Sequence, residues 1–583
     1  MEASRTLKRT APTSRGVSAY SRKRAVIACQ VCRARRTKCD QKKPRCSFCE
    51  SVGAECVSDV QAMSSFDPAS LAIIERLDGL ERELKCLTRW QTQNQSPCGL
   101  SSSSWSWNPR PRSEPALPPT LECMLSWPVF QADASAEFPP AHFPSPAADA
   151  CARSDLRQSV QARLMGPESV EIKSIHHLEL TDRFFADVHT RNPILDEAKT
   201  RVLARDVYER GVRWDAETCL ALLVWANGAL ARPFPGSPAG SENVDEELGL
   251  EREYEKGLAL FYAAEQRFGC LFAAAGVLQG QCFFLAGVFL MAVLRPLDAW
   301  RLFVNGLSIC RVVKRTAAGG SVGSNSADQV ALESVYWSLW KSERELNREL
   351  ELGGSCPSSA PPEYFACLPA KCGEDDLRTW YFYLSEISAW RLETYVEETI
   401  SCPNSRSLYL QDLVVVADNL RQQIAEWQNS LAARVYSRSS DVESDIGMLP
   451  LIIRARILYI RDLISWPFVH ALLHHGAPAA PQPQSPAVKA WTEAGLSCHL
   501  SKLLNHKPQF YYRHHGTWLM LRSCARSAFI LLGAARLRSA EPLLPPGWRA
   551  AVADTLEMLK FWQPQVNELQ SPIQRLQVLF YSL

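Results

Sequence analysis

The sequence predicts a small metal-nucleated domain near the N-terminus, then a short coiled coil, a disordered linker and a large all-α body. Three observations lead to this fold class. Six cysteines crowd into residues 29–56, proline and serine are frequent in residues 91–165, and helical apolar periodicity with few strand signals fills residues 166–583. The first domain is too small to bury an adequate core, whereas the last is large enough to do so.

Residues 1–28 form a basic arm that we expect to be disordered. The arm has no apolar stretch of the kind that a secretory signal peptide needs. Arg22, Lys23 and Arg24 are a candidate nuclear localisation signal and could equally contact phosphate.

Residues 1–60 contain 14 Lys and Arg against 5 Asp and Glu, a net charge of +9, whereas the whole chain carries +2. A basic N-terminal region followed by a mildly acidic remainder of the chain indicates that the N-terminal region binds nucleic acid.

The cysteine segment has the spacing C-x2-C-x6-C-x6-C-x2-C-x6-C, so three cysteines recur at a constant offset of 17 residues. The six are Cys29, Cys32, Cys39, Cys46, Cys49 and Cys56. No histidine precedes His142, so a metal bound here is held by sulfur alone. Two tetrahedral zinc ions need eight sulfur ligands, and six thiolates supply eight only if two of them bridge both metals. Metal binding would then provide the folding energy that a small core cannot.

A disulfide framework is the alternative interpretation of an even number of cysteines. It is disfavoured because no signal peptide precedes the segment. The other 14 cysteines are scattered, several within apolar runs, as is typical of reduced and buried thiols.

The two halves of the segment differ in charge. The first half reads Arg33-Ala-Arg35-Arg36-Thr-Lys38 between its second and third cysteines, whereas the matching stretch of the second half has two acids and no base. If each C-x2-C opens a helix, the first helix attracts phosphate, and its arginines can pair with guanine in the major groove. The second half would then be a scaffold. A charge run of this kind is otherwise an ordinary solvated helix face.

This pattern resembles the fungal binuclear zinc cluster family of transcription regulators, the Zn2Cys6 type, and Pro44 matches the loop proline of that family. The resemblance implies a DNA-binding domain at residues 29–56 that holds two Zn²⁺ ions bridged by Cys29 and Cys46. It also implies that Arg35 and Arg36 read CGG-type triplets, although the family usually has lysine at the second position. The candidates for phosphate contacts are Arg33, Lys38, Lys42 and Lys43.

Behind the cluster, residues 57–69 are a connector and residues 70–90 have the apolar spacing of a short coiled coil. The seam consists of Ile73, Leu77, Leu80, Leu84 and Leu87. The seam is short and contains Gly79, so an ordinary amphipathic helix is the alternative. Because this seam directly follows a domain that would bind one half-site, the pattern favours a homodimer. Such a dimer would recognise two triplets on double-stranded DNA. Residues 91–165 follow as a linker, since residues 97–146 hold 11 of the 37 prolines in the chain.

The body, residues 166–583, is predicted to be helical throughout. The expected helices are 181–189, 217–230, 251–268, 280–294, 297–311, 332–350, 384–398, 413–427, 452–474, 491–504 and 517–536. Segments such as Val335-Tyr-Trp-Ser-Leu-Trp340 resemble the middle homology region of the same family, and Arg513-His-His-Gly-Thr-Trp518 resembles a further element of that family. That resemblance implies a regulatory domain that binds co-regulators or a small-molecule effector.

Three features of the body allow sharper interpretations. Residues 268–294 lack charge and are long enough to span a bilayer, but their glycines predict a break into two buried helices, so we expect no membrane partner. Residues 319–323 satisfy G-x-S-x-G without the strand that a nucleophile elbow requires. His470 and His474 have metal-ligand spacing on a helix without the rest of a zinc motif. Each is expected to be structural, and no catalytic residue is identified.

Together these patterns predict a nuclear, zinc-dependent, sequence-specific transcription factor of RNA polymerase II genes, and not an enzyme. By family analogy it would control secondary metabolism or nutrient use. The alternatives are an enzyme or a protein-interaction scaffold that carries a zinc-cluster appendage.

Overall fold

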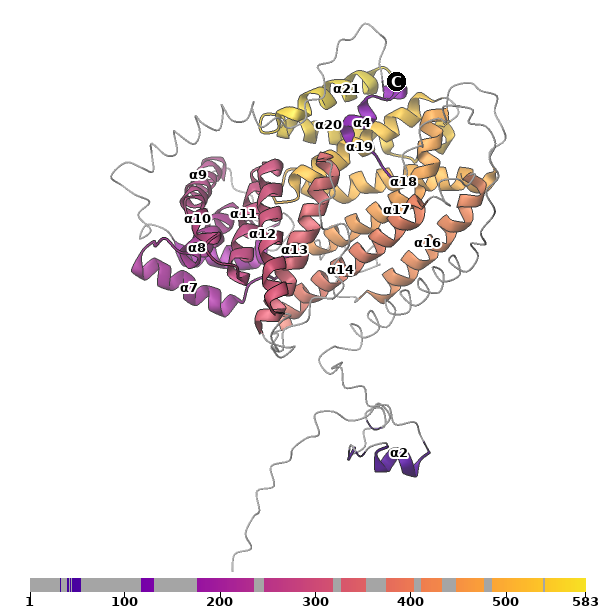
Figure 1. The fold of residues 1–583 in the computed structure, drawn as a ribbon. Coiled ribbons are helices and arrows are strands. Elements are labelled where there is room, and N and C mark those ends of the chain that lie inside the picture. Colours follow the sequence, from indigo (N-terminus) through magenta and orange to yellow (C-terminus); the bar gives the residue numbers. More distant parts are fainter. Residues whose placement is uncertain are drawn as a thin grey trace, which may run out of the picture. The chain divides into compact units, whose positions relative to one another are not determined.

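The computed structural model describes residues 32, 39–40, 42, 45–53, 117–130, 176–234, 246–317, 327–352, 374–402, 410–431, 447–475, 485–537 and 540–583. The chain divides into two compact units, Met1–Asp67 and Pro68–Leu583. Within the described part of the first unit, the regular element is the short helix α2, Ser47–Ser51 (Figure 1). The predicted arm, the coiled-coil seam and residues 319–323 lie outside the described residues.

The second unit is helical over every described stretch, and no strand occurs there. Its helices are α4 Leu121–Leu125, α6 His177–Arg183, α7 Glu197–Arg210, α8 Ala216–Leu230, α9 Glu246–Glu265, α10 Phe268–Leu271, α11 Val277–Ala292, α12 Pro296–Ala317, α13 Ala327–Leu350, α14 Glu374–Ser401, α16 Leu410–Ser430, α17 Met448–His475, α18 Pro486–His506, α19 Thr517–Arg536, α20 Trp548–Trp562 and α21 Gln570–Tyr581. Every helix that the sequence predicts overlaps one of these, which confirms the all-α prediction.

Two groups of helices lie on either side of α13 and α14 (Figure 1). In the first group α8 packs on α9 and α11, and α11 packs on α12. In the second group α17 packs on α16 and α18, and α18 packs on α19. One large hydrophobic cluster runs through both groups and includes the fully buried Trp225, Trp337 and Trp518. A smaller cluster joins α14, α16 and α17.

The uncharged segment 268–294 is interrupted as the sequence predicts. Helix α10 ends at Leu271, and α11 begins at Val277 after the N-cap residue Gly276. Helix α11 has 16 residues and is buried along most of its length. Helix α19 is the described helix that is long and apolar enough to cross a membrane, but 83% of its apolar window is buried inside the unit. That burial is typical of a core helix.

The structure differs from the linker prediction at residues 117–130. Thr120 caps α4, and the 3₁₀ turn η1, Pro128–Phe130, follows it. Met124 and Phe130 are fully buried in the main hydrophobic cluster, where the Phe130 ring contacts that of Phe529 in α19. Apolar side chains spaced among the prolines therefore find a core provided by distant helices, which the local composition does not reveal.

The pair His470 and His474 packs against this same segment. The two imidazoles stack with centroids 4.2 Å apart, and the Trp127 ring lies 4.3 Å from that of His474. This packing agrees with the structural interpretation of the pair.

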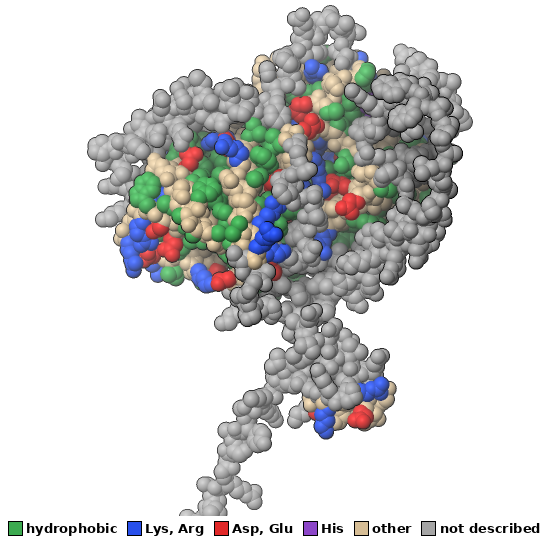
Figure 2. Space-filling model, in the orientation of Figure 1, with side chains coloured by type: hydrophobic (Ala, Val, Ile, Leu, Met, Phe, Trp, Pro, Cys, Tyr) green, Lys and Arg blue, Asp and Glu red, His purple; other side chains and the backbone are tan. Residues whose placement is uncertain are grey.

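On the face shown in Figure 2, the described surface of the helical unit has basic and acidic side chains interspersed among apolar ones.

Candidate metal centre

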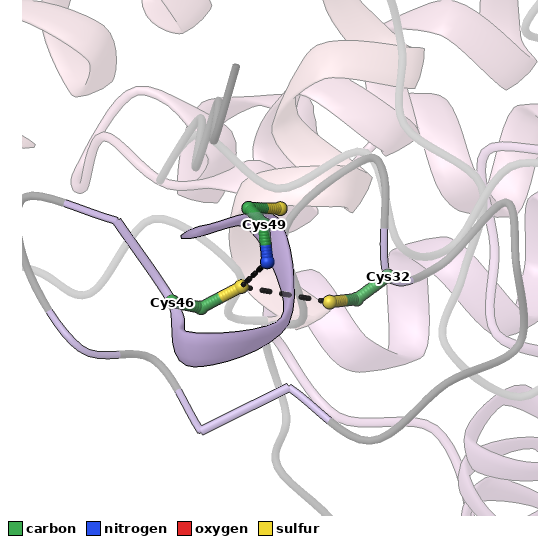
Figure 3. A group of neighbouring side chains, drawn as sticks. All are labelled: Cys32, Cys46 and Cys49. Carbon is green, nitrogen blue, oxygen red and sulfur yellow. Dashed lines mark hydrogen bonds between the residues drawn. The ribbon is translucent and has the colours of Figure 1, made fainter. Parts of the chain in front are cut away.

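Three cysteine side chains meet in the first unit and are completely buried (Figure 3). Cys32 comes from the first half of the repeated pattern, and Cys46 and Cys49 come from the second. Their sulfur atoms all lie within 4.8 Å of one another, and Cys32 Sγ is 3.6 Å from Cys46 Sγ. Among the described residues, this is the group of metal-ligating side chains that could hold an ion.

The start of α2 positions two of the three sulfurs. Cys46 is the N-cap residue in an extended conformation, and its sulfur accepts the backbone N–H of Cys49 at 3.5 Å. The two-residue spacing therefore places both side chains on the same side of the helix start. After Ser51 the helix closes at Gly53, whose φ of +64° is a conformation that glycine adopts without strain.

Asp40 fixes the chain between the two halves. Its carboxylate accepts the backbone N–H of Ser47 at 2.9 Å and the hydroxyl of Ser47 at 2.5 Å. These hydrogen bonds from Ser47 lower the pKa of Asp40, so the carboxylate is ionised at neutral pH. Sequence reasoning missed this residue, because an aspartate seven positions before a serine matches no capping pattern.

The sulfur geometry can be tested against a tetrahedral zinc site. With Zn–S bonds of 2.3 Å, two thiolates on one ion lie about 3.8 Å apart. The observed 3.6 Å between Cys32 and Cys46 agrees with this value and is far longer than the S–S bond of a disulfide. Since Cys32 and Cys46 come from different halves, both halves of the repeat contribute to this site. The residues present fit zinc.

The remaining predicted ligands and contacts are only partly described. Cys39 packs beside the buried group, although its sulfur is not among the three that meet. Lys42 is exposed, with 73% of its side chain accessible, and its ammonium lies 3.8 Å from Asp40. The other predicted metal and DNA-contact residues, Cys29, Cys56, Arg33, Arg35, Arg36, Lys38 and Lys43, lie outside the described residues, as do Arg22, Lys23 and Arg24.

Comparison with known proteins identifies this segment. Residues 27–65 match the model of the fungal Zn(2)-Cys(6) binuclear cluster domain, which is a zinc-binding domain. The cysteine geometry and this match agree on the nature of the metal.

Several curated fungal proteins are similar to parts of the chain. Oleate-activated transcription factor 1 of Saccharomyces cerevisiae is 39% identical over 72 residues, which are 12% of this chain and 7% of that protein. Regulatory protein CAT8 of the same yeast is 36% identical over 83 residues, 14% of this chain and 6% of that protein. The putative transcription factor ecdB of Aspergillus rugulosus is 29% identical over 222 residues, 36% of this chain and 37% of that protein.

The chain thus spans well under two thirds of the length of each of these relatives. The relatives are named as transcription factors or regulators, a class distinct from enzymes. No solved structure matches the chain.

Proposed function

We propose that this chain, which carries a fungal Zn(2)-Cys(6) binuclear cluster domain at residues 27–65, is a sequence-specific DNA-binding transcription factor acting on RNA polymerase II genes in the nucleus. The observation that carries the proposal is the convergence of Cys32, Cys46 and Cys49 at zinc-site distances within that domain. The names of the fungal relatives support the same class.

The domain would bind two Zn²⁺ ions through all six cysteines, with Cys29 and Cys46 as the bridging thiolates. The distance of 3.6 Å between the sulfurs of Cys46 and Cys32, which come from different halves, supports a ligand shared between the half-sites. Zinc would supply the folding energy of this unit and fix the helices that contact DNA.

DNA would be bound by the cations between the second and third cysteines. Arg35 and Arg36 are proposed to read guanines of CGG-type triplets, while Arg33, Lys38, Lys42 and Lys43 would contact phosphates. The contact of Lys42 with Asp40 holds its ammonium beside the loop that leads into α2. Phosphate contacts position the domain, and the arginines specify the sequence.

The rest of the chain would pair and regulate the DNA-binding domain. The seam Ile73, Leu77, Leu80, Leu84 and Leu87 is proposed to form a homodimer, so that two triplets are bound at once. The helical unit would be the regulatory domain that receives co-regulators or an effector. A role in secondary metabolism or nutrient use is proposed by analogy with the family.

The test is fluorescence anisotropy of the purified full chain with a duplex that contains two CGG triplets. We expect binding that is abolished by a zinc chelator, weakened steeply by salt and lost when the triplets are replaced by AAA. The double substitution Arg35→Ala/Arg36→Ala should remove the preference for CGG. The control Arg201→Ala/Arg205→Ala removes the same charge from α7 and should leave binding unchanged. Equal affinity for both duplexes, or full binding in the chelator, would contradict the proposal.

A further inference from the structure

A cavity of about 220 Å³ opens inside the helical unit, bordered by α13, α14, α17 and the start of α19. Because one water takes up roughly 30 Å³ in the liquid, the cavity has room for a small organic molecule. The wall also includes Arg191 and Asn192, from a segment far away in the sequence. The cavity belongs to the helical unit alone and has no residue in common with the metal centre.

Five cationic side chains line the cavity, and four of them have acidic partners. Lys341 pairs with Glu386, Arg348 with Glu393 and Glu397, Arg456 with Glu345 and Glu393, and Arg526 with Glu349. Arg344 also pairs with Glu397, so these five acids are balanced by five neighbouring cations. The fifth cation of the cavity wall, Arg191, has no carboxylate within ion-pair distance among the described residues.

Arg191 is buried nonetheless, with 6% of its surface exposed. Its Nη1 donates to Nδ1 of His515 at 3.3 Å. Asp187 is the acid that interacts with it electrostatically, from beyond ion-pair distance. A buried guanidinium without a directly paired counter-ion is costly, so the site favours an anion at hydrogen-bond distance.

His514 adds a second donor that lacks an acceptor. Its Nδ1 accepts the backbone N–H of Gly516 at 3.0 Å. Burial lowers the pKa of His514 well below its usual range, so the ring is neutral and its proton must reside on Nε2. That Nε2 is buried and has no hydrogen-bond partner, and the same holds for Oδ1 of Asn192. Both residues line the cavity, although these two atoms are themselves shielded from it.

The start of α19 contributes to the same end of the cavity, since Gly516, Leu519 and Met520 line it. The N-terminus of a helix of 20 residues carries partial positive charge, which adds to that of Arg191. Arg191 is a single cation without an ion pair in the described part of the chain, so it is balanced by a ligand with one negative charge. A carboxylate carries one negative charge, whereas a phosphate dianion carries two. The planar guanidinium also fits the two oxygens of a carboxylate.

We infer that this cavity binds a small organic carboxylate, held by Arg191. The inference does not depend on the DNA-binding function, because binding is measured directly on the helical unit within the full chain.

Isothermal titration calorimetry of the purified full chain tests this, with benzoate, succinate and citrate as probes. Succinamide is the uncharged control, and inorganic phosphate tests whether another anion binds. We expect saturable binding of at least one carboxylate at about 10 mM or tighter, and none of succinamide or phosphate. Arg191→Gln should weaken binding by more than about tenfold, the effect of losing a charged hydrogen bond.

Arg201→Gln is the matched control, because Arg201 is an ion-paired arginine of α7 that does not line the cavity. It should bind as the unaltered chain does. Ser523→Phe fills the cavity while leaving Arg191 and His514 in place, and it should also abolish binding. Without ligand, Arg191→Gln should be at least as stable as the unaltered chain in urea, whereas a purely structural arginine would lower stability.

The inference is overturned if none of the three carboxylates binds saturably, if phosphate binds as well as they do, or if Ser523→Phe retains full affinity.

Discussion

Arg522 in α19 donates to both carboxylate oxygens of Glu122 in α4, at 2.7 and 2.5 Å, although 400 residues separate the two. The same guanidinium donates from Nε to Glu349 at 3.1 Å, and only 3% of Arg522 is exposed. Arg575 in α21 further donates to the carbonyl of Leu125 at 3.1 Å. Residues 117–130 are therefore part of the helical unit, held by charged hydrogen bonds as well as by apolar burial.

Replacing Glu122 should consequently destabilise the helical unit. Glu122→Ala leaves Arg522 with one acidic partner instead of two, and we expect a loss of about 1–3 kcal/mol in the free energy of unfolding. Glu557→Ala is the control, because its pair with Lys560 is exposed and should contribute at most about 0.5 kcal/mol. Urea unfolding followed by circular dichroism measures both. Equal midpoints for the two variants would contradict the role given to Glu122.

Periodicity predicted most of the helices with apolar faces, but it missed α20 and α21, which also bury apolar faces, and the polar helix α7. Helix α19 was predicted with its observed limits, because apolar residues recur along all of it and Gly516 precedes it. Helix α7 was missed, since its buried positions are Thr200, Ala204 and Val207 and the rest is charged. A helix that buries so narrow a face has little apolar signal in sequence.

The candidate sites show the same limit. Fixed spacing reveals cysteine ligands, because a metal imposes it on local sequence. Arg191, His514 and Asn192 converge from separate segments, so nothing in the linear order predicts their cavity. The charged interior around Glu393, which is fully buried between Arg348 and Arg456, likewise depends on the packing of α13, α14 and α17.

Stability of the helical unit should fall as the pH drops from 6.5 to about 4. Burial lowers the pKa of His499 to about 4, and Lys502 and Arg526 oppose the attraction of Asp462. The unfolded chain binds a proton near pH 6.5 while the folded one does not, so acidification favours unfolding across this window. The shift corresponds to about 3 kcal/mol in total.

His499→Gln removes this titration. The free energy of unfolding, measured with urea, should therefore depend less on pH in this variant, by that amount. Other titrating groups are common to both proteins, so the difference between the two curves isolates His499. Parallel curves from pH 7 to pH 4.5 would show that the buried imidazole is already protonated in the folded protein.

Zinc content should report the bridging role of Cys46. If this sulfur is shared by both metals as proposed, Cys46→Ala should disrupt both metal positions and leave less than one zinc per chain by elemental analysis. Cys49→Ala should retain about one zinc, since the first half-site keeps its own ligands. Cys219→Ala, at a buried cysteine of α8, should keep the full content. Identical losses in the Cys46 and Cys49 variants would rule out the bridge.

Asp40 should slow the release of zinc without binding it. Its carboxylate holds Ser47 at the start of α2, directly beside Cys46. In Asp40→Ala the helix start is less restrained, and we expect zinc to pass to a chromogenic chelator several-fold faster at an unchanged stoichiometry. Ser51→Ala removes a hydroxyl from the opposite end of α2 and serves as the comparison. An unchanged rate of zinc release in the Asp40 variant would show that this residue makes a surface contact without restraining the metal site.

Gly228 in α8 allows the closest backbone approach in the first group of helices. A Cβ atom at this position would lie 2.0 Å from the carbonyl oxygen of Leu180 in α6. A carbonyl of a packed helix cannot move aside as the end of a flexible side chain can, so Gly228→Ala must separate α6 from α8. That cost should exceed the gain of about 1 kcal/mol in helix propensity and leave a net loss of about 2 kcal/mol or more.

Gly269→Ala, where no atom lies within 4 Å of the added carbon, should be neutral or slightly stabilising. Thermal unfolding of the two variants would decide the matter, and a stable Gly228→Ala protein would mean that α6 is not seated on α8 at this distance.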